Sequence, residues 1–279
     1  MKGWLTAIAG VAALVQAGTA RASAEAIDKS YRATALAYPI STTAPSQFAV
    51  VQPGLALVPL GGGVVVAGWN GWFIRPQRAP VEAVAATKNG DVYLVERGSR
   101  EMTLALAARD PKGRLLPPRP IGTLPLGRYL MVAGPQAVWL SASTAGAEGS
   151  TLWQATSTGV TQASTSKRRV SALTVVGSGV GVAVGRDVLV LRPGRPAERI
   201  GVLDVVPDGM AVDARGVLYY STLAGVFRVA GPSRSELVVR GAHGPLHAQG
   251  GAIFMLWRER NQVLKFSRDP KATQGRGHG

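Results

Sequence analysis

Residues 207–220 read Pro-Asp-Gly-Met-Ala-Val-Asp-Ala-Arg-Gly-Val-Leu-Tyr-Tyr, and this stretch decides the fold class. A segment of small residues leads into a turn that ends at Gly216, and a bulkier apolar segment follows, which is the pattern of a β-hairpin. Weaker copies of this pattern recur at spacings of about 30 to 46 residues, and such periods are typical of β-propeller blades. One blade cannot bury both faces of its sheet alone, so the blades must stack around a ring.

Five further hairpins align with the first. In each of them, a glycine-rich or Asn-Gly turn and then a bulkier strand follow an opening segment. The opening segments are Val51–Leu57, Glu82–Ala86, Arg128–Val132, Ser171–Val175 and His243–Leu246. No sustained amphipathic pattern with a helical period accompanies them. We therefore predict an all-β fold, a six-bladed β-propeller, and the uneven spacing leaves seven blades as an alternative.

The ends of the sequence differ from its middle. Residues 1–24 contain a positively charged start, an apolar run from Trp4 to Val15 and an Ala-x-Ala pattern, which predict a secretory signal peptide. The apolar run is too short for a comfortable membrane span, so we expect cleavage rather than an uncleaved anchor. Residues 25–268 are predicted to form a single propeller domain. The polar, glycine-rich residues 269–279 are predicted to form a mobile tail.

The predicted signal peptide implies a periplasmic or extracellular protein of a bacterial cell, with no transmembrane segment after cleavage. The sequence has no cysteine, which excludes a cysteine-linked lipid anchor, disulfide bonds and thiolate metal sites. Stability must therefore come from the closed ring itself. The segment Tyr31–Tyr38 has the composition of a strand and precedes the first hairpin, so we expect it to form an outer strand of the last blade.

The formal net charge is +15, which favours an acidic partner or an anionic surface. The basic residues are scattered except at Lys167–Arg169, and no aromatic residues interleave with that cluster, which argues against nucleic acid as a partner. The alternative explanation of the positive charge is that these side chains only keep the outer strands solvated. Trp69–Trp72 and Trp257–Arg260 lie near the ends of second strands, where loops could present a binding surface.

Polar residues stand at equivalent positions in the hairpins. The innermost strand of each blade lines the channel of a propeller, so residues at the strand starts are expected to converge on one end of the axis. These positions hold Gln52 or Pro53, Glu82, Arg128, Ser171, Asp208 and His243. Such a ring could bind an anionic or sugar-like ligand, hold a divalent cation, or shift the pKa values of its members. Ordinary solvent-exposed turn positions are also polar, which is the alternative explanation.

Residues 206–229 carry a family resemblance. They resemble the P-D-G-x-x-x-D-x-x-G-x-L-W-V-A segment of the gluconolactonase, senescence-marker-protein and regucalcin family of six-bladed propellers, and more loosely strictosidine synthase-like and NHL-type propellers. The resemblance implies a central divalent cation, such as calcium, zinc or manganese, that polarises a lactone carbonyl and activates water. It also implies that Asp208 is a metal ligand, with Glu82 as the glutamate ligand. The family's remaining ligands are asparagines, for which His243 could partly compensate as a nitrogen ligand.

This sequence also departs from the family pattern. The family glutamate lies in a Glu-x-Pro context that Glu82 lacks, and Arg128 and Ser171 stand where asparagine ligands are expected. An arginine cannot ligate a metal ion and repels it. An inward-facing Arg128 would therefore form ion pairs with Glu82 and Asp208 instead. We expect His247 to face outward or into its blade.

The sequence leaves two main functions open. The first is an exported binding module that recognises a small-molecule ligand or another envelope protein through its channel mouth and loops. The second is a metal-dependent hydrolase of lactones or esters that uses Asp208 with Glu82 or His243. A third is an adhesin that binds an anionic surface through its positive charge. A serine nucleophile is not indicated, because the sequence has no Gly-x-Ser-x-Gly elbow.

Overall fold

The computed structural model describes residues 28, 31–38, 45, 47–52, 54–60, 63–68, 71–77, 79–144, 148–231 and 234–268. The predicted signal peptide (residues 1–24), the predicted tail (residues 269–279) and the pair Trp69 and Asn70 lie outside these residues. Within the described part of the chain, no helix is both long and apolar enough to span a membrane.

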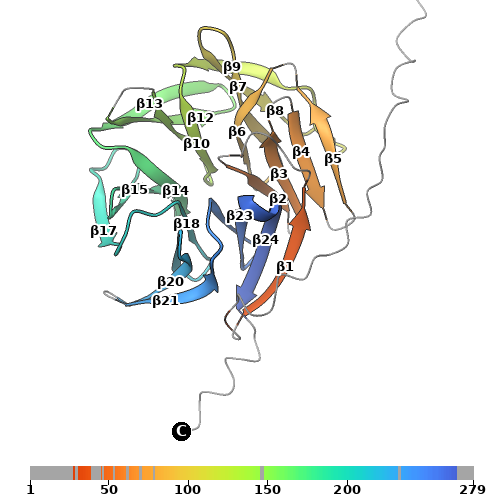
Figure 1. Ribbon diagram of the computed structural model, residues 1–279. Coiled ribbons are helices and arrows are strands. Elements are labelled where there is room, and N and C mark those ends of the chain that lie inside the picture. The colour runs from red at the N-terminus through yellow and green to blue at the C-terminus, as the bar shows by residue number, and fades with distance from the viewer. Residues whose placement is uncertain are drawn as a thin grey trace, which may run out of the picture.

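Six four-stranded antiparallel sheets stand around a ring, so the predicted all-β, six-bladed propeller is confirmed (Figure 1). Blade 1 contains β2 (Ala49–Gln52), β3 (Leu55–Leu60), β4 (Gly63–Gly68) and β5 (Gly71–Pro76). Blade 2 contains β6 (Val81–Ala86), β7 (Val92–Arg97), β8 (Met102–Ala107) and β9 (Arg119–Leu124). Blade 3 contains β10 (Arg128–Ala133), β11 (Val138–Ser143), β12 (Ser150–Thr156) and β13 (Gly159–Ser166).

Blade 4 contains β14 (Val170–Val176), β15 (Gly179–Val184), β16 (Asp187–Leu191) and β17 (Glu198–Val202). Blade 5 contains β18 (Gly209–Val212), β19 (Leu218–Thr222), β20 (Gly225–Gly231) and β21 (Arg234–Arg240). Blade 6 contains β22 (Leu246–Gln249), β23 (Ala252–Trp257) and β24 (Gln262–Arg268), together with β1 (Tyr31–Ala37) from the other end of the sequence.

The first strand lies innermost in blades 1 to 5, and β22 lies innermost in blade 6. Contacts join β2 to β6, β6 to β10, β10 to β14, β14 to β18, β18 to β22 and β22 back to β2, which closes the ring. Because every blade repeats the same up-and-down order, all six inner strands begin at the same end of the ring. We call this end the channel mouth. It is the end at which the sequence pattern predicts the polar residues to gather.

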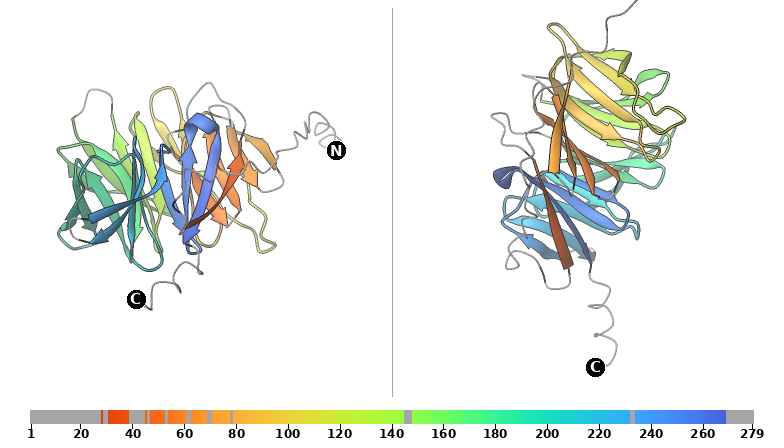
Figure 2. Two further views of the ribbon diagram at one scale, coloured as in Figure 1. Left: turned by 60° about the horizontal axis from the view of Figure 1, so that its bottom comes forward. Right: turned by 90° about the vertical axis from the view of Figure 1, so that its right-hand side faces the viewer.

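Strand β1 closes the ring as the sequence predicts. It pairs with β24 along its whole length, so that Tyr31 faces Arg268 and Ala37 faces Gln262. In Figure 2 the red strand lies beside the blue strands of blade 6. The phenol of Tyr31 also lies 3.2 Å from that of Tyr219 in blade 5. The first and last strands of the described chain therefore share one sheet.

The core lies between the blades rather than within one of them. Strand β23 illustrates this arrangement, because all six of its residues are buried. Ile253 and Met255 pack into the cluster between blades 5 and 6, while Phe254 and Leu256 pack into the cluster between blades 6 and 1. Successive side chains of a strand point to opposite faces, so an uninterrupted apolar run is what a sheet with two buried faces requires.

The prediction for the first hairpin was wrong by one strand. Gly54 turns the chain with a φ of 96°, so Val51 and Leu57 belong to different strands, β2 and β3. The adjacent glycine-rich stretch at residues 61–63 then joins β3 to β4 rather than the first strand to the second. Gln52 consequently lies at the end of inner strand β2, away from the channel mouth. Pro53 lies outside the described residues.

Candidate ligand-binding site

The glycine of the Pro-Asp-Gly segment allows blades 5 and 6 to meet closely. A Cβ atom on Gly209 would lie 2.5 Å from the carbonyl oxygen of Gly244 and 2.7 Å from the backbone nitrogen of Leu246. The hydroxyl of Ser221 donates a hydrogen bond to the same Gly244 carbonyl, and the backbone N–H of Asp208 donates to the carbonyl of Ser221 (2.9 Å). The start of β18 is thereby fixed against the connection between β21 and β22.

This packing places Asp208 beside His243. Oδ2 of Asp208 lies 3.4 Å from Nδ1 of His243, and Oε1 of Glu259 lies 3.0 Å from Nε2 on the other side of the ring. Glu259 belongs to the 3-10 turn η2 (Arg258–Arg260) between β23 and β24. Only the doubly protonated imidazolium can donate to both carboxylates at once. The three side chains join the loops of blades 5 and 6 at the channel mouth.

The second aspartate of the Pro-Asp-Gly segment, Asp213, stabilises the turn and is not part of the site. Its Oδ1 accepts hydrogen bonds from the backbone N–H groups of Arg215 (2.9 Å) and Val217 (3.0 Å). Its Oδ2 forms an ion pair with the Arg215 guanidinium (2.9 Å). Gly216 completes the turn with a φ of 81°, which favours glycine. Only Asp208 of the two aspartates therefore reaches the channel mouth.

A cavity of about 540 Å³ opens beside Asp208. Four blades line it: blade 3 with the start of β10, blade 4 with the start of β14 and the turn between β15 and β16, blade 5 with the loop before β18, and blade 6 with η2. The lining residues are Arg128, Tyr129, Leu130, Ser143, Arg168, Arg169, Val170, Ser171, Gly185, Val206, Pro207, Asp208 and Arg258. Guanidinium groups and apolar side chains thus face one space.

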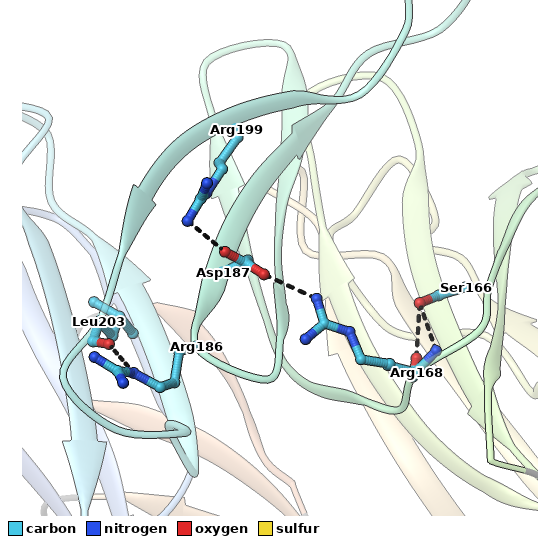
Figure 3. Close-up of polar contacts among 6 residues, drawn as sticks. All are labelled: Ser166, Arg168, Arg186, Asp187, Arg199 and Leu203. Atoms are coloured by element: carbon cyan, nitrogen blue, oxygen red, sulfur yellow. Dashed lines mark hydrogen bonds and ion pairs between the residues drawn. The ribbon is translucent and has the colours of Figure 1, made fainter.

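A network of polar contacts fixes the wall of this cavity in blade 4 (Figure 3). Asp187 accepts a hydrogen bond from Arg168 (2.8 Å) and forms an ion pair with Arg199 (2.8 Å). The hydrogen bond from Arg168, aided by the charge of Arg199, lowers the pKa of the Asp187 carboxyl below its ordinary value. Nε of Arg186 donates to the carbonyl of Leu203 (2.8 Å), which holds the loop that carries Val206 and Asp208.

The structure brings together residues from four of the six positions predicted for the channel mouth. Arg128, Ser171 and Asp208 line the cavity, and His243 lies beside Asp208 without lining it. Glu82 is not among the lining residues. Its carboxylate forms an ion pair with Arg97, with an Nη2–Oε2 distance of 3.0 Å. Arg97 ends the strand that pairs with the strand of Glu82, so this ion pair is local to blade 2.

Sequence reasoning assigned no role in the site to five residues that contribute to it. Arg168 and Arg169 belong to the basic cluster noted in the sequence, but nothing in the pattern indicated that the loop before β14 faces a cavity. Arg258 and Glu259 lie in the segment Trp257–Arg260, where the sequence predicted a loop surface without predicting a role for either residue. Val206 lies in the irregular loop between β17 and β18.

The family resemblance implies a divalent cation, and the geometry tests whether these residues suit one. Among the described residues, no group of three or more His, Asp or Glu side chains is placed to hold a metal ion. Asp208 and Glu259 are both directed at the ring nitrogens of His243, and Glu82 is directed at Arg97. Four arginines line the adjacent cavity, and guanidinium groups repel cations. In this arrangement the donor set does not fit a metal ion.

The channel between the inner strands contains a buried amide. Gln47 precedes β2 and is only 4% exposed. Its Nε2 donates to the carbonyls of Val84 in β6 (3.0 Å) and Met131 in β10, and its Oε1 accepts from the backbone N–H of Met131 (2.6 Å). Inner strands are sheet edges whose backbone groups lack a strand partner on the channel side. Gln47 supplies those partners and joins blades 1, 2 and 3.

His247 is the other histidine near the channel. It lies on inner strand β22 opposite Phe254, and its ring approaches the edge of Phe48 with a centroid distance of 6.3 Å. Desolvation by burial lowers the pKa of His247 from 6.5 to about 4. The neutral ring is therefore the form that packs between blades 6 and 1.

Replacing His247 by glutamine is expected to make the protein more resistant to acid. As pH falls below 6.5 the unfolded chain takes up the proton first, because the folded-state pKa is about 4, so the wild type loses stability between those values. Between pH 7 and pH 4.5 the wild type should lose about 2 kcal/mol more than His247→Gln. Urea unfolding at both pH values measures this difference. Equal losses in the two proteins would contradict the assignment.

The fold and this cavity define the class of protein. It is a six-bladed β-propeller with an arginine-lined cavity at the channel mouth. No protein-family model matches the sequence, and no curated protein sequence matches it either. Solved structures with a similar fold include a gluconolactonase from Xanthomonas campestris, at 14% identity and a TM-score of 0.60, covering 85% of this chain and 90% of that chain.

Two further solved structures have a similar fold. The PQQ-bound aldose sugar dehydrogenase from Streptomyces coelicolor is 13% identical with a TM-score of 0.59, covering 85% of this chain and 99% of that chain. The calcium-binding protein regucalcin from Agrobacterium tumefaciens is 13% identical with a TM-score of 0.55, covering 77% of this chain and 86% of that chain. At these identities the similarity concerns the fold, and proteins with different activities share it.

Proposed function

We propose that this protein is an exported binding module that takes up a small-molecule ligand in the cavity at its channel mouth. The observation that carries this proposal is the cavity itself, about 540 Å³ in volume and lined by residues from the starts of two inner strands and from the loops beside them. Ligand sites are commonly concavities of about 300 to 1,000 Å³ with apolar walls and a few converging polar groups. Export is proposed from the signal-peptide pattern of residues 1–24.

The arrangement suits binding better than catalysis. Asp208, which lines the cavity, and Glu259 are both engaged by His243, and Asp187 in the wall is engaged by Arg168 and Arg199. The hydroxyl oxygens of Ser143 and Ser150 lie 3.0 Å apart. Among the described residues, neither serine is paired with a general base that could activate it. Rigid attachment of the cavity walls through Asp187 and Arg186 favours a pre-formed binding site.

A metal-dependent hydrolase of lactones or esters is the second candidate. Two observations favour it: the similarity of the fold to a gluconolactonase, and the position of Asp208 beside His243 at the channel mouth. An ion would require the carboxylates of Asp208 and Glu259 to leave the imidazole and the arginines to move away. An envelope protein as partner is the alternative to a small molecule for the binding module.

Closing the cavity with a bulky side chain tests the proposal. Val206 lines the cavity and is 53% exposed, while its neighbour Val205 is 45% exposed and does not line it. Val206→Trp should therefore abolish binding without disturbing the fold, and Val205→Trp is the matched control. Small polar fragments screened by ligand-observed NMR should bind the wild type and Val205→Trp and fail to bind Val206→Trp.

The outcomes separate the candidates. Fragments that bind all three proteins equally would contradict a binding site in this cavity. Lactone hydrolysis that requires added calcium, zinc or manganese and disappears in Asp208→Ala would favour the hydrolase instead. An intact envelope protein that binds while no fragment does would favour a protein partner.

A further inference from the structure

We propose that the ligand of this cavity is a small organic anion, with a carboxylate or phosphate group held by Arg128 and Arg169 and an apolar body held by the facing wall. This inference rests on the proposed ligand-binding function of the same cavity and adds the chemical class of the ligand.

The charges that line the cavity are strongly unbalanced. Four arginines and one aspartate face the space. The aspartate, Asp208, is already paired with His243 at 3.4 Å. Like charges gathered around one cavity repel each other, and a bound anion would remove that repulsion. The cavity is therefore electrostatically complementary to a negatively charged ligand.

Two of the four arginines already have partners and two do not. Arg168 donates to the carboxylate of Asp187, and Nε of Arg258 donates to the carbonyl of Pro45 (2.8 Å). The side chains of Arg128 and Arg169 make no hydrogen bond or ion pair with any residue in the described part of the chain. A guanidinium presents five donors in a fixed fork that matches carboxylate and phosphate oxygens. Arg128 and Arg169 are thus the two groups able to bind the anion.

The rest of the lining selects an organic ligand over a bare inorganic ion. Leu130, Pro207 and Val206 face the same space, and Val206 is 53% exposed although it is apolar. A ligand with an apolar body would remove this side chain from water, which stabilises the complex. The hydroxyl of Ser171 is buried without a hydrogen-bond partner among the described residues, so the wall also holds a polar group with unused capacity.

A nucleic acid does not fit this lining. Binding of single strands requires exposed aromatic rings on which bases stack. Tyr129 is the aromatic residue of the lining, and it is buried with its hydroxyl donating to the carbonyl of Pro125 (2.6 Å). Trp257, next to η2, is also buried. The cavity therefore offers charge and an apolar wall but no stacking platform.

Calorimetric titration with three probes tests the proposal: butyl phosphate, butyrate and the uncharged analogue butanol. The wild type should bind both anions and should not bind butanol. Arg128→Gln and Arg169→Gln should each weaken binding of butyl phosphate by about tenfold or more, because a hydrogen bond to a charged group is lost. Binding should also weaken as salt is raised, since the contact is ionic.

Lys167→Gln is the matched control. Lys167 is exposed, carries the same charge, and lies in the same loop as Arg169 without lining the cavity. It should change the affinity by no more than about twofold, because an exposed charge outside the site contributes little. An equal effect of Lys167→Gln and Arg169→Gln would mean that only the overall positive charge matters, which would overturn the proposal. Melting temperatures confirm that each variant is folded.

The remaining outcomes distinguish this inference from the proposed function. If neither anion binds while neutral fragments bind and are blocked by Val206→Trp, the anion proposal is overturned and the binding cavity stands. If nothing binds and Val206→Trp changes nothing, both fail. Vesicles that contain phosphatidylglycerol present the same phosphate chemistry on a surface. Binding to vesicles without binding to butyl phosphate would overturn the small-molecule ligand in favour of a membrane headgroup.

Discussion

Gly209→Ala is expected to lower the free energy of unfolding by about 3 kcal/mol or more, because the added methyl group meets backbone atoms that cannot move aside. The Cβ atom would lie 2.5 Å from the carbonyl oxygen of Gly244 and 2.8 Å from Cα of Pro245. Relief would require blades 5 and 6 to separate at the channel mouth. Chemical denaturation of the wild type and the variant measures the loss.

Gly231→Ala is the control for this substitution. Gly231 lies in β20 of the same blade, and a Cβ atom there would have no neighbour within 4 Å. The two variants add the same methyl group, so they differ only in what that group meets. Gly231→Ala should leave the unfolding free energy within about 0.5 kcal/mol of the wild type. A comparable loss in both variants would show that the contact with Gly244 is unimportant.

Gly209→Ala should also weaken ligand binding at the channel mouth. Asp208 and His243 face each other because Gly209 lets the connection between β21 and β22 approach β18. Separation of the two blades would therefore shift Asp208, which lines the cavity, away from His243. Ligand binding should weaken in Gly209→Ala even at temperatures where the protein is still folded. Unchanged affinity in the folded variant would mean that the glycine serves stability alone.

Gln47→Leu is the second substitution with a large expected effect. Leucine is similar in size but offers no hydrogen bonds, so the carbonyl of Val84 and both backbone groups of Met131 would lose their partners in a buried place. An unsatisfied buried polar group costs about 1 to 3 kcal/mol, so a total loss of about 3 to 5 kcal/mol is expected. Urea unfolding of both proteins measures it.

Gln249→Leu provides the comparison. Gln249 also reaches from one inner strand to another, since its Nε2 donates to the carbonyl of Val51 (3.2 Å). Its Oε1, however, is buried without a hydrogen-bond partner among the described residues. Gln249→Leu removes one hydrogen bond, which lowers stability, and one unpaired buried oxygen, which raises it. The free energy of unfolding should therefore fall by about 1 kcal/mol or less. Similar losses in the two variants would contradict the bridging role of Gln47.

The strand pattern made most of the fold predictable. An apolar run such as Ala252–Trp257 indicates a strand buried on both faces, and the glycine turns indicate where hairpins reverse. The outer position of Tyr31–Ala37 was predictable because the last blade otherwise lacked a strand. The first hairpin was predicted wrongly because the sequence has glycines at two places, Gly54 and residues 61–63, and either place is suited to the turn that follows the inner strand. Their order along the sequence does not say which of them follows the inner strand.

The candidate site was predictable only where it depends on position along a strand. Arg128 and Ser171 were expected at the channel mouth because each stands at the start of an inner strand, and both line the cavity. The partner of a charged side chain depends on side-chain direction, which the repeat does not encode, and Glu82 lies within reach of Arg97 one hairpin away. The contacts of Gln47 join three blades, so they exist only once the ring has closed.

The pairing of β1 with β24 also means that blade 6 cannot be completed until both strands have been made. β1 is among the first strands to leave the ribosome, yet its partner β24 is the last strand of the described chain. β1 therefore has no partner strand until β24 has been made. Contacts between distant parts of a sequence slow folding. A chain interrupted before Gln262 leaves both β1 and the edge of β23 unpaired, which are the exposed edges that favour aggregation.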